Sequence, residues 1–445
     1  MNTKAFQSFK QTSTKTNMNE AAIPTPHWSP LKKLAFRFLF LYFLLYCFPF
    51  PLDAIEWTNS IVQPYFNFLN FIIKKIGTHL LHVPVRVAFP GFDKVDDSYY
   101  GLTFLFITLI LSVTGTLIWS VLDRERKNYS LLNKWFQFYL RYFLASYLLG
   151  YGFVKFFPSQ FEEVTASRLV MQVGEQTPML MAWNFMGYSV AFSRISGTIE
   201  IIAGLLLFFR RTTTMGAMLA TITFGFVTLL DYCFNVPVKL LISHLMLISL
   251  VVLLNDGRRL FYLLLLNKPV EAVTYSPFFK KQSWRKGFVI LQAICIAGIL
   301  WKTIVESLDA AKQWGRYAPR VPLYGIYQTD IFIRNGDTIP PLQTESLRWK
   351  QLVIDGGSWK QSGLITFNDD KKTFYNIKAD TAKQMMRIQS IADTLNTYTF
   401  HFAKPIGNHL LLEGKWMNDS IKVFLTKTDI DSFNLYSNHF HIVND

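Results

Sequence analysis

The sequence predicts an α-helical polytopic membrane bundle of about seven transmembrane helices, followed by an all-β extracytoplasmic domain, a small barrel or sandwich. Three observations lead to this prediction. Hydrophobic residues make up 51% of the 445 residues and charged residues 17%, whereas soluble globular chains carry about 25% charged residues. Apolar runs of about 20 residues, long enough to cross a bilayer, recur as far as residue 305. Beyond it, short alternating segments separated by Gly, Asn and Asp are typical of strands and turns.

The elements follow in order along the chain. Residues 1–33 form a polar cytoplasmic tail, residues 34–305 the transmembrane domain, residues 306–322 a linker, and residues 323–445 the β-rich domain. The predicted spans are Leu34–Phe50, Tyr99–Leu122, Leu132–Phe156, Gly187–Phe209, Thr214–Phe234, Val238–Leu254 and Gly287–Val305. Each is an apolar run that reaches or approaches the length that a helix needs to cross the hydrocarbon core.

The segment 55–83 is apolar but interrupted by Pro64, Lys74 and Lys75. We expect an interfacial helix on the outer surface of the bilayer, and a further span is the alternative. A span at this point would invert every later loop, and the distribution of basic residues argues against that.

Basic residues set the expected orientation. Lys and Arg number 45 against 30 Asp and Glu, and most of this excess lies in alternate short loops between the apolar runs. Positive residues accumulate on the cytoplasmic side of a membrane. The sequence therefore predicts a cytoplasmic N-terminus and a C-terminal domain on the outer side; with the resemblance given below, this implies a bacterial inner-membrane protein with a periplasmic C-terminal domain. The lipid bilayer is an expected partner and an extracytoplasmic protein is a candidate partner. Nucleic acid is not expected, because the soluble domain lacks a basic stripe.

Eight strands are expected in the last 120 or so residues, enough for a small closed barrel or a sandwich. The Asn368-Asp369-Asp370 and Met417-Asn418-Asp419 tripeptides are expected to be hairpin turns. The predicted strands are Tyr324–Ile333, Arg348–Ile354, Gln361–Phe367, Lys372–Lys378, Thr397–Phe402, His409–Trp416, Ser420–Thr426 and Phe433–Val443.

Ionisable side chains within the spans are the best functional candidates, because a charge in hydrocarbon is costly without a partner or a polar cavity. Counting helical rise from the inner ends places Arg141 level with Glu200, and Arg194 level with Asp231. Either pair could instead stabilise the packing of two helices without a functional role, and we give the two interpretations equal weight. The candidate intramembrane polar pocket, open to the outer side, consists of Arg141, Lys155, Arg194, Glu200, Asp231, Lys239 and His244.

Other candidate sites are weaker. His439 and His441 share a strand face, as metal ligands might, but no third ligand lies near them in sequence, so no metal site is predicted. Glu162 and Glu163 could act as acid and base, although a solvated loop pair is the ordinary interpretation. No phosphate-binding glycine loop or nucleophile elbow occurs. No cofactor is evident in the sequence, so electrons in a redox role would have to pass through a diffusible quinone or a partner.

Two motifs add a resemblance. The YGFVKFFPSQF segment at residues 151–161 and the SRISGTIEIIAGLLL segment at residues 193–207 resemble the DoxX/DoxD-like family of bacterial membrane proteins. The resemblance covers a core of about residues 130–266, and the matching positions are Gly152, Lys155, Glu200 and Gly204. It implies a four-helix membrane core, associated in some members with quinone-linked sulfur oxidation or membrane oxidoreductase complexes. The additional spans and the β domain depart from the minimal family pattern.

Two functional hypotheses follow, and neither establishes whether the protein is an enzyme. The first is the membrane subunit of a redox or small-molecule handling complex, possibly quinone-linked, with the polar pocket as its site. The second is a non-catalytic membrane-anchored carrier or assembly factor whose β domain binds an apolar ligand or a protein partner. A transporter is disfavoured because the sequence shows no inverted repeat.

Overall fold

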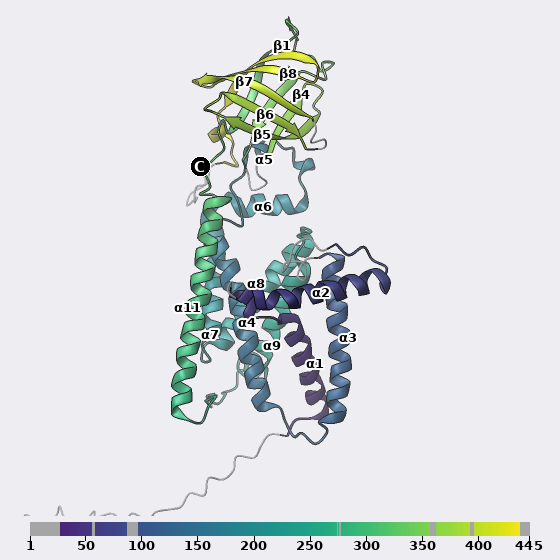
Figure 1. The fold of residues 1–445 in the computed structure, drawn as a ribbon. Coiled ribbons are helices and arrows are strands. Elements are labelled where there is room, and N and C mark those ends of the chain that lie inside the picture. Colours follow the sequence, from purple (N-terminus) through teal and green to yellow (C-terminus); the bar gives the residue numbers. More distant parts are fainter. Residues whose placement is uncertain are drawn as a thin grey trace, which may run out of the picture.

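The computed structural model describes residues 27–55, 58–86, 97–273, 275, 277–356, 362–391 and 396–436. A helical region forms one end of the molecule and a β-barrel the other (Figure 1). The helices are α1 (Pro30–Cys47), α2 (Asn59–His79), α3 (Tyr99–Leu122), α4 (Ser130–Phe156), α5 (Ala166–Leu169), α6 (Pro178–Tyr188), α7 (Val190–Phe208), α8 (Thr213–Cys233), α9 (Lys239–Leu254), α10 (Gly257–Leu260) and α11 (Gln282–Gln313), and the short π-helix η5 (Phe261–Leu265) follows α10.

The helical region is membrane-embedded by length and composition. Among the described residues, four helices are long and apolar enough to cross a membrane: α3, α7, α8 and α11. A fifth candidate is α9 together with the segment 257–265, which bends away from it by 74°. Large apolar side chains stay exposed on α3, for example Leu109, Ile110 and Leu117, as on a surface that lipid tails cover. The count of seven spans stays a prediction.

Helix α2 differs from its neighbours in direction. Figure 1 shows it running crosswise to α3, near the end of α3 that is closer to the barrel. Its exposed side carries apolar side chains such as Phe68 and Phe71, and Lys74 and Lys75 follow on the same helix. This arrangement favours the interfacial helix that the sequence predicts for residues 55–83.

Small residues bring α4 and α7 into close contact. A Cβ atom added at Gly197 would lie 2.4 Å from the carbonyl oxygen of Gly152, and one added at Gly152 would lie 2.9 Å from the carbonyl oxygen of Gly197. Gly204 continues the contact, because its Cβ position is 3.3 Å from the Ala145 carbonyl oxygen. Small residues that let backbones approach are the usual basis of helix packing in membranes. The α4–α7 pair therefore forms the close-packed centre of the bundle.

The strands form an antiparallel sheet with the order β2-β1-β3-β4-β5-β6-β7-β8-β9. Strand β9 also pairs with β1, from Ile326 opposite Thr428 to Arg334 opposite Ile421, so the sheet closes into an eight-stranded barrel with β2 as a short extension of β1. The strands are β1 (Gly325–Arg334), β2 (Asp337–Thr338), β3 (Trp349–Ile354), β4 (Ser362–Phe367), β5 (Lys372–Asp380), β6 (Met385–Ser390), β7 (Thr397–Ile406), β8 (His409–Trp416) and β9 (Asp419–Thr428).

Side chains fill the inside of the barrel. Trp349 is fully buried, and its ring lies 5.1 Å from that of Trp416 and 5.7 Å from that of Phe400. Leu412 and Ile388 are also fully buried in the same cluster. An eight-stranded barrel is just wide enough for side chains to fill it. This interior is a packed apolar core.

Two strand predictions were wrong. Strand β6 was not predicted, although Met386 and Ile388 point inward from it, because its two inward apolar residues are separated by polar ones in a stretch too short to stand out. Residues 433–436 form no strand, since β9 already closes the barrel on β1. Phe433 and Tyr436 instead pack beside Ile326 and Val353 on the outside of the barrel. Residues 437–443 of that predicted strand lie outside the described residues.

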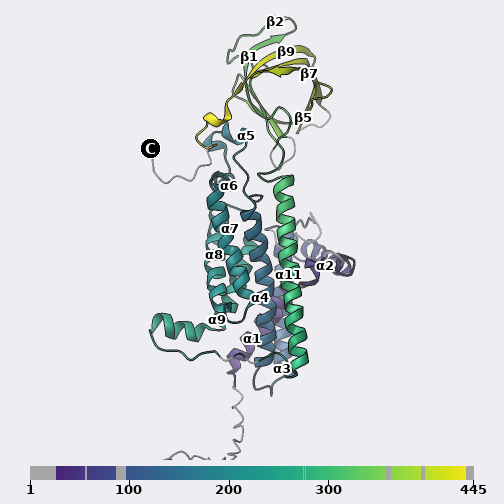
Figure 2. The ribbon, with the colours of Figure 1, turned by 90° about the vertical axis from the view of Figure 1, so that its left-hand side faces the viewer.

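Helix α11 leads directly to the barrel. It continues past Val305, where the predicted span ends, to Gln313, so much of the segment expected to be a linker is helical. Gly315 then passes close to the loop after α4, because a Cβ added there would lie 2.8 Å from the Pro158 carbonyl oxygen. Figure 2 shows the barrel standing above the end of the bundle where α6 and the end of α11 lie.

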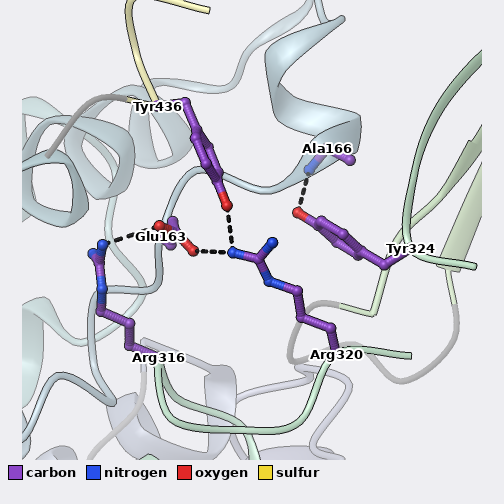
Figure 3. A network of polar contacts seen from close by, with 6 residues as sticks. All are labelled: Glu163, Ala166, Arg316, Arg320, Tyr324 and Tyr436. Atoms are coloured by element: carbon purple, nitrogen blue, oxygen red, sulfur yellow. Dashed lines mark hydrogen bonds and ion pairs between the residues drawn. The ribbon is translucent and has the colours of Figure 1, made fainter. Parts of the chain in front are cut away.

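The loop after α4 fastens the barrel to this end through an ion-pair network (Figure 3). The Glu163 carboxylate accepts hydrogen bonds from Arg316, at 2.9 Å, and from Arg320, at 3.1 Å. Arg320 also donates to the Tyr436 hydroxyl. Glu163, one of the two glutamates considered as an acid and base, is thus held in the contact between loop and linker.

Helix α5 adds a second contact to the barrel. The Ala166 amide donates to the Tyr324 hydroxyl at 3.1 Å, and the Ser167 amide donates to the Asp355 carboxylate at 3.0 Å. Burial raises the pKa of the Tyr324 phenol, which keeps it protonated. The contact buries Ala166 completely against Ile326 of β1. Bundle and barrel therefore meet through both apolar and polar groups.

A third contact lies at the edge of this region. Lys372 of β5 donates to the carboxylate of Glu175, at 2.6 Å. That hydrogen bond, together with one from the Gln172 amide, lowers the pKa of Glu175. Both side chains reach solvent, so we expect this link to be weak.

Candidate intramembrane polar site

The central feature of the site is a buried ion pair between α4 and α7. Lys155 Nζ lies 2.7 Å and 2.8 Å from the two carboxylate oxygens of Glu200. Lys155 is 5% exposed and Glu200 is 1% exposed. The depth count had made Arg141 a geometrically allowed partner of Glu200, and that pairing is wrong: Lys155 extends from the end of α4 to the carboxylate.

Neighbouring groups fix this ion pair in place. The Ser193 hydroxyl donates to the Lys155 carbonyl oxygen at 3.0 Å, across the close contact of the two helices. The Tyr151 ring lies one helical turn before Lys155, and its centroid is 5.4 Å from the ammonium nitrogen. A cation over an aromatic face is stabilised by the ring quadrupole. Lys155 therefore has both a carboxylate and an aromatic partner in the bundle.

Asp231 on α8 lies next to this pair and is bound less completely. It is 3% exposed, and its Oδ2 atom has no hydrogen-bond partner among the described residues. It interacts electrostatically with Lys155, Lys239 and Asp97, and also with Tyr151. The alternative that Asp231 pairs with Arg194 is wrong, because Arg194 is exposed on α7 and donates to the Tyr317 hydroxyl at 2.8 Å.

Lys239 connects the site to the barrel side of the bundle. Its ammonium group lies 3.2 Å from the Asp97 carboxylate, which also accepts from the backbone amides of Lys239 and Leu240 at the start of α9. A carboxylate at a helix N-terminus satisfies amides that have no partner within the helix. Asp97 thereby joins the start of α3 to α9, and its pair with Lys239 is half-buried.

His244 forms a separate cluster with two tyrosines of α1. Its Nε2 atom is 2.8 Å from the Tyr42 hydroxyl and its Nδ1 atom is 2.6 Å from the Leu240 carbonyl oxygen. The carbonyl can accept only from a protonated Nδ1, so Nε2 of a neutral ring accepts from Tyr42. The Tyr46 ring stacks on the imidazole at 4.3 Å, and the buried Tyr46 hydroxyl has no partner among the described residues.

These tyrosines are not among the candidate site residues predicted from the sequence. Tyr42 and Tyr46 are four residues apart on α1, so they share one helix face. Tyr147 and Tyr151 repeat this spacing on α4, and both interact electrostatically with Tyr46. The repeated Tyr spacing was the available signal, but aromatic residues in an apolar helix usually face lipid.

Arg141 lies apart from the other candidates. Its Nε atom donates to the Leu207 carbonyl oxygen at 2.8 Å, near the end of α7, and one terminal nitrogen has no partner among the described residues. The structure therefore brings Lys155, Glu200 and Asp231 together and links Lys239 to them. It leaves Arg194 and Arg141 at other positions.

This arrangement offers hydrogen-bond donors, acceptors and an aromatic face in an apolar region. Within the parts of the chain that the structure describes, no three His, Cys, Asp or Glu side chains gather as metal ligands would. His439 and His441 lie outside the described residues. Such a site suits a molecule that has polar groups on an otherwise apolar body.

Comparison with known proteins gives one relative. No protein-family model and no solved structure matches the chain. The chain is similar to the uncharacterized protein YwoB of Bacillus subtilis (strain 168), with 34% identity over 119 residues. The matched region is 27% of this chain and 75% of that protein.

Proposed function

This chain belongs to the family of the Bacillus subtilis protein YwoB, and from that premise we propose that it binds a lipid-soluble, quinone-like molecule in its bundle. The site is the group formed by Lys155, Glu200, Asp231 and Tyr151. In this proposal the protein is the membrane subunit of a redox or small-molecule handling complex. The proposal concerns binding and assigns no reaction.

The observation that carries the proposal is the free oxygen of Asp231. A buried polar atom without a hydrogen bond costs about 1–3 kcal/mol, and more if the group is charged. Asp231 Oδ2 is such an atom, in a region of apolar helices. Ionisable groups inside a membrane are kept where a substrate or proton path needs them. A ligand hydroxyl that donates to Oδ2 would remove this cost.

The chemistry of the neighbouring groups fits the two forms of a quinone. Lys155 has three N–H donors, and its two contacts with Glu200 leave one for a quinone carbonyl oxygen. Asp231 Oδ2 can accept from a quinol hydroxyl. The Tyr151 ring offers a flat apolar surface for the ligand ring. The apolar tail of such a ligand would lie in the surrounding lipid.

The resemblance to the DoxX/DoxD-like family supports the same region. Its four matching positions, Gly152, Lys155, Glu200 and Gly204, all lie where α4 packs on α7. A motif that preserves a helix pair together with its ion pair would give this distribution. We include membership of that family, and its association with quinone-linked complexes, in the proposal.

The proposal also includes a location and an orientation. The basic loops predict a bacterial inner membrane with a cytoplasmic N-terminus and a periplasmic barrel. In Figure 1, α1 begins at the end of the bundle that lies away from the barrel. A periplasmic protein partner would then reach the polar site from the barrel side, where Lys239 and Asp97 lie.

Titration with decylubiquinol, the reduced form whose hydroxyl group can donate to Asp231 Oδ2, tests the proposal. The full-length protein is placed in nanodiscs and binding is followed by quenching of its tryptophan fluorescence. We expect binding at least about tenfold weaker in Asp231→Asn, because a hydrogen bond to a charged group is lost. Glu306→Gln is the matched control, since it neutralises an exposed carboxylate on α11. Equal affinity in all three proteins would contradict the proposal.

The alternative function, a barrel that carries an apolar ligand, has less support. The barrel interior is filled by Trp349, Phe400, Trp416 and their neighbours. An apolar ligand would have to displace these side chains. A protein partner bound to the outside of the barrel remains compatible with the proposed site in the bundle.

A further inference from the structure

We propose a second binding site, for a phosphate group, at the end of the bundle away from the barrel. Its residues are Arg141 and Lys134 of α4 and Arg210 of the turn between α7 and α8, beside the ring of Phe278. This site is independent of the proposed quinone-like ligand. It would take an anionic lipid headgroup or a free phosphate compound, which share this chemistry.

The first observation is the state of Arg141. It is 5% exposed, and one terminal nitrogen of its guanidinium is buried without a hydrogen-bond partner among the described residues. Its Nε donates to the Leu207 carbonyl oxygen. That bond provides a donor for a carbonyl group in the last turn of α7. It leaves one terminal nitrogen of the guanidinium group without an acceptor. A guanidinium donates up to five hydrogen bonds, and phosphate is one of its best acceptors.

The second observation is that other cations lie close to it. Arg210 interacts electrostatically with both Arg141 and Lys134. The guanidinium carbon of Arg210 is 5.1 Å from the centroid of the Phe278 ring, and Lys134 Nζ is 4.7 Å from the same centroid. Two cations that contact the same ring repel each other, and a bound anion would stabilise Arg210, Lys134 and Arg141 together.

The third observation places this cluster at the surface of the membrane. Arg141 lies level with the end of α7, where the turn with Arg210 and Arg211 begins. Next to it, the rings of Trp135, Phe138, Phe278 and Phe288 are in mutual contact. Aromatic belts of this kind mark the level of lipid headgroups.

The same end of the bundle has a second feature suited to a lipid surface. After α9 the chain turns by 74° into the segment 257–265, which projects sideways from the bundle in Figure 2. This segment combines Arg258 and Arg259 with the exposed side chains of Phe261, Leu264 and Leu265. Basic and apolar groups together are typical of a helix that lies on an anionic membrane.

Arg141 as a plain cap of α7 would explain its bond to Leu207. It would not explain the unused nitrogen, nor the gathering of Arg210 and Lys134 around one ring. A cap also predicts no preference among lipids. Lipid selectivity therefore separates the two interpretations.

The test uses the full-length protein purified in detergent and then exposed to mixed vesicles of phosphatidylglycerol and phosphatidylcholine. Native mass spectrometry counts the lipids that stay bound. We expect the wild type to retain phosphatidylglycerol and Arg210→Gln to retain about fivefold less, as the loss of one basic residue near an anionic surface predicts. Arg141→Gln should show the same loss if it folds, and Arg210→Gln provides the test if it does not.

Lys286→Gln is the matched control, because Lys286 is an exposed cation at the same end of the bundle. A second arm adds inorganic phosphate and follows thermal unfolding. Stabilisation of the wild type but not of Arg210→Gln would identify a free phosphate compound, and selective retention of phosphatidylglycerol a lipid. No selective retention together with no phosphate effect would overturn the proposal, and so would an equal loss in Lys286→Gln.

Discussion

At the centre of the barrel, the rings of Trp349, Phe400 and Trp416 pack against one another, whereas the centre of the bundle holds Lys155, Glu200 and a partly unbonded Asp231. The barrel follows the usual rule for a soluble domain, with apolar side chains inside. The bundle places its charges inside and its apolar side chains outside, towards lipid. This difference is the reason that our proposal places ligand binding in the bundle and not in the packed barrel.

The largest expected loss of stability comes from breaking the buried ion pair of Lys155 and Glu200. Lys155→Met leaves the Glu200 carboxylate buried without its partner, and we expect a loss of about 3–5 kcal/mol in the free energy of unfolding. The double variant Lys155→Met with Glu200→Met should recover most of this loss, because no charge is left unpaired. Unfolding by SDS titration measures both. Equal losses in the single and double variants would contradict this account, because the unpaired Glu200 carboxylate would then not be the cause of the loss.

A cavity in the barrel should have a smaller effect, limited to that domain. Leu412→Ala removes a fully buried side chain, and we expect a loss of about 3 kcal/mol in barrel stability. Urea unfolding followed by the near-ultraviolet signal of the barrel tryptophans measures it. Binding of decylubiquinol in the bundle should stay unchanged. A parallel loss of binding would mean that the two regions are not separate in function.

A variant in the contact between the bundle and the barrel should have a smaller effect than a cavity in the barrel. Glu163→Gln weakens the contacts with Arg316 and Arg320, and we expect a cost of about 1 kcal/mol to docking. Trypsin cleaves after both arginines, so faster cleavage of the linker reports the loosened contact. Glu306→Gln, an exposed carboxylate earlier on α11, should leave the cleavage rate unchanged. Identical rates in both variants would contradict a docking role for Glu163.

The smallest effect is a pH dependence of the contact between Glu175 and Lys372 of the barrel. Lys372 lowers the pKa of Glu175 below its ordinary value of 4.5. Because the folded-state pKa is the lower one, the contact contributes above about pH 4.5 and is lost as the pH falls through the lowered pKa. Linker cleavage by pepsin should therefore accelerate at acidic pH less in Lys372→Gln than in the wild type. Lys350→Gln, which acts within the barrel, is the control. Identical acid profiles for wild type and Lys372→Gln would exclude this link.

Strand positions were largely predictable from the sequence, because the alternation of inward and outward residues repeats every two residues. His409–Trp416 was predicted with its observed bounds, and the turn at Asp370 was expected, where the backbone has a positive φ of 64°. Closure into a barrel depends on the long-range pairing of β1 with β9. No local pattern encodes that pairing.

The pairing in the site was not predictable, and for Arg141 neither was the level. The depth count placed Arg141 level with Glu200, whereas Arg141 lies beside Leu207, near the end of α7. Helical rise gives a height only from an assumed helix end, and it does not give the face of the helix on which a residue lies. Gly152 and Gly197 let the backbones of α4 and α7 approach closely. This approach fixes which faces of the two helices meet, and Lys155 therefore lies against Glu200. The contribution of α1 to the His244 cluster could not be derived either, because it depends on how distant helices pack.

The most direct test of the proposed site is the identity of the small molecules that purify with the protein. Wild type, Asp231→Asn and Glu306→Gln are extracted in parallel from equal amounts of detergent-solubilised protein, and the extracts are compared by mass spectrometry. We predict a quinone-like molecule enriched in the wild type and in Glu306→Gln and depleted in Asp231→Asn. The same set of bulk lipids in all three extracts, with no such molecule, would contradict the proposed site.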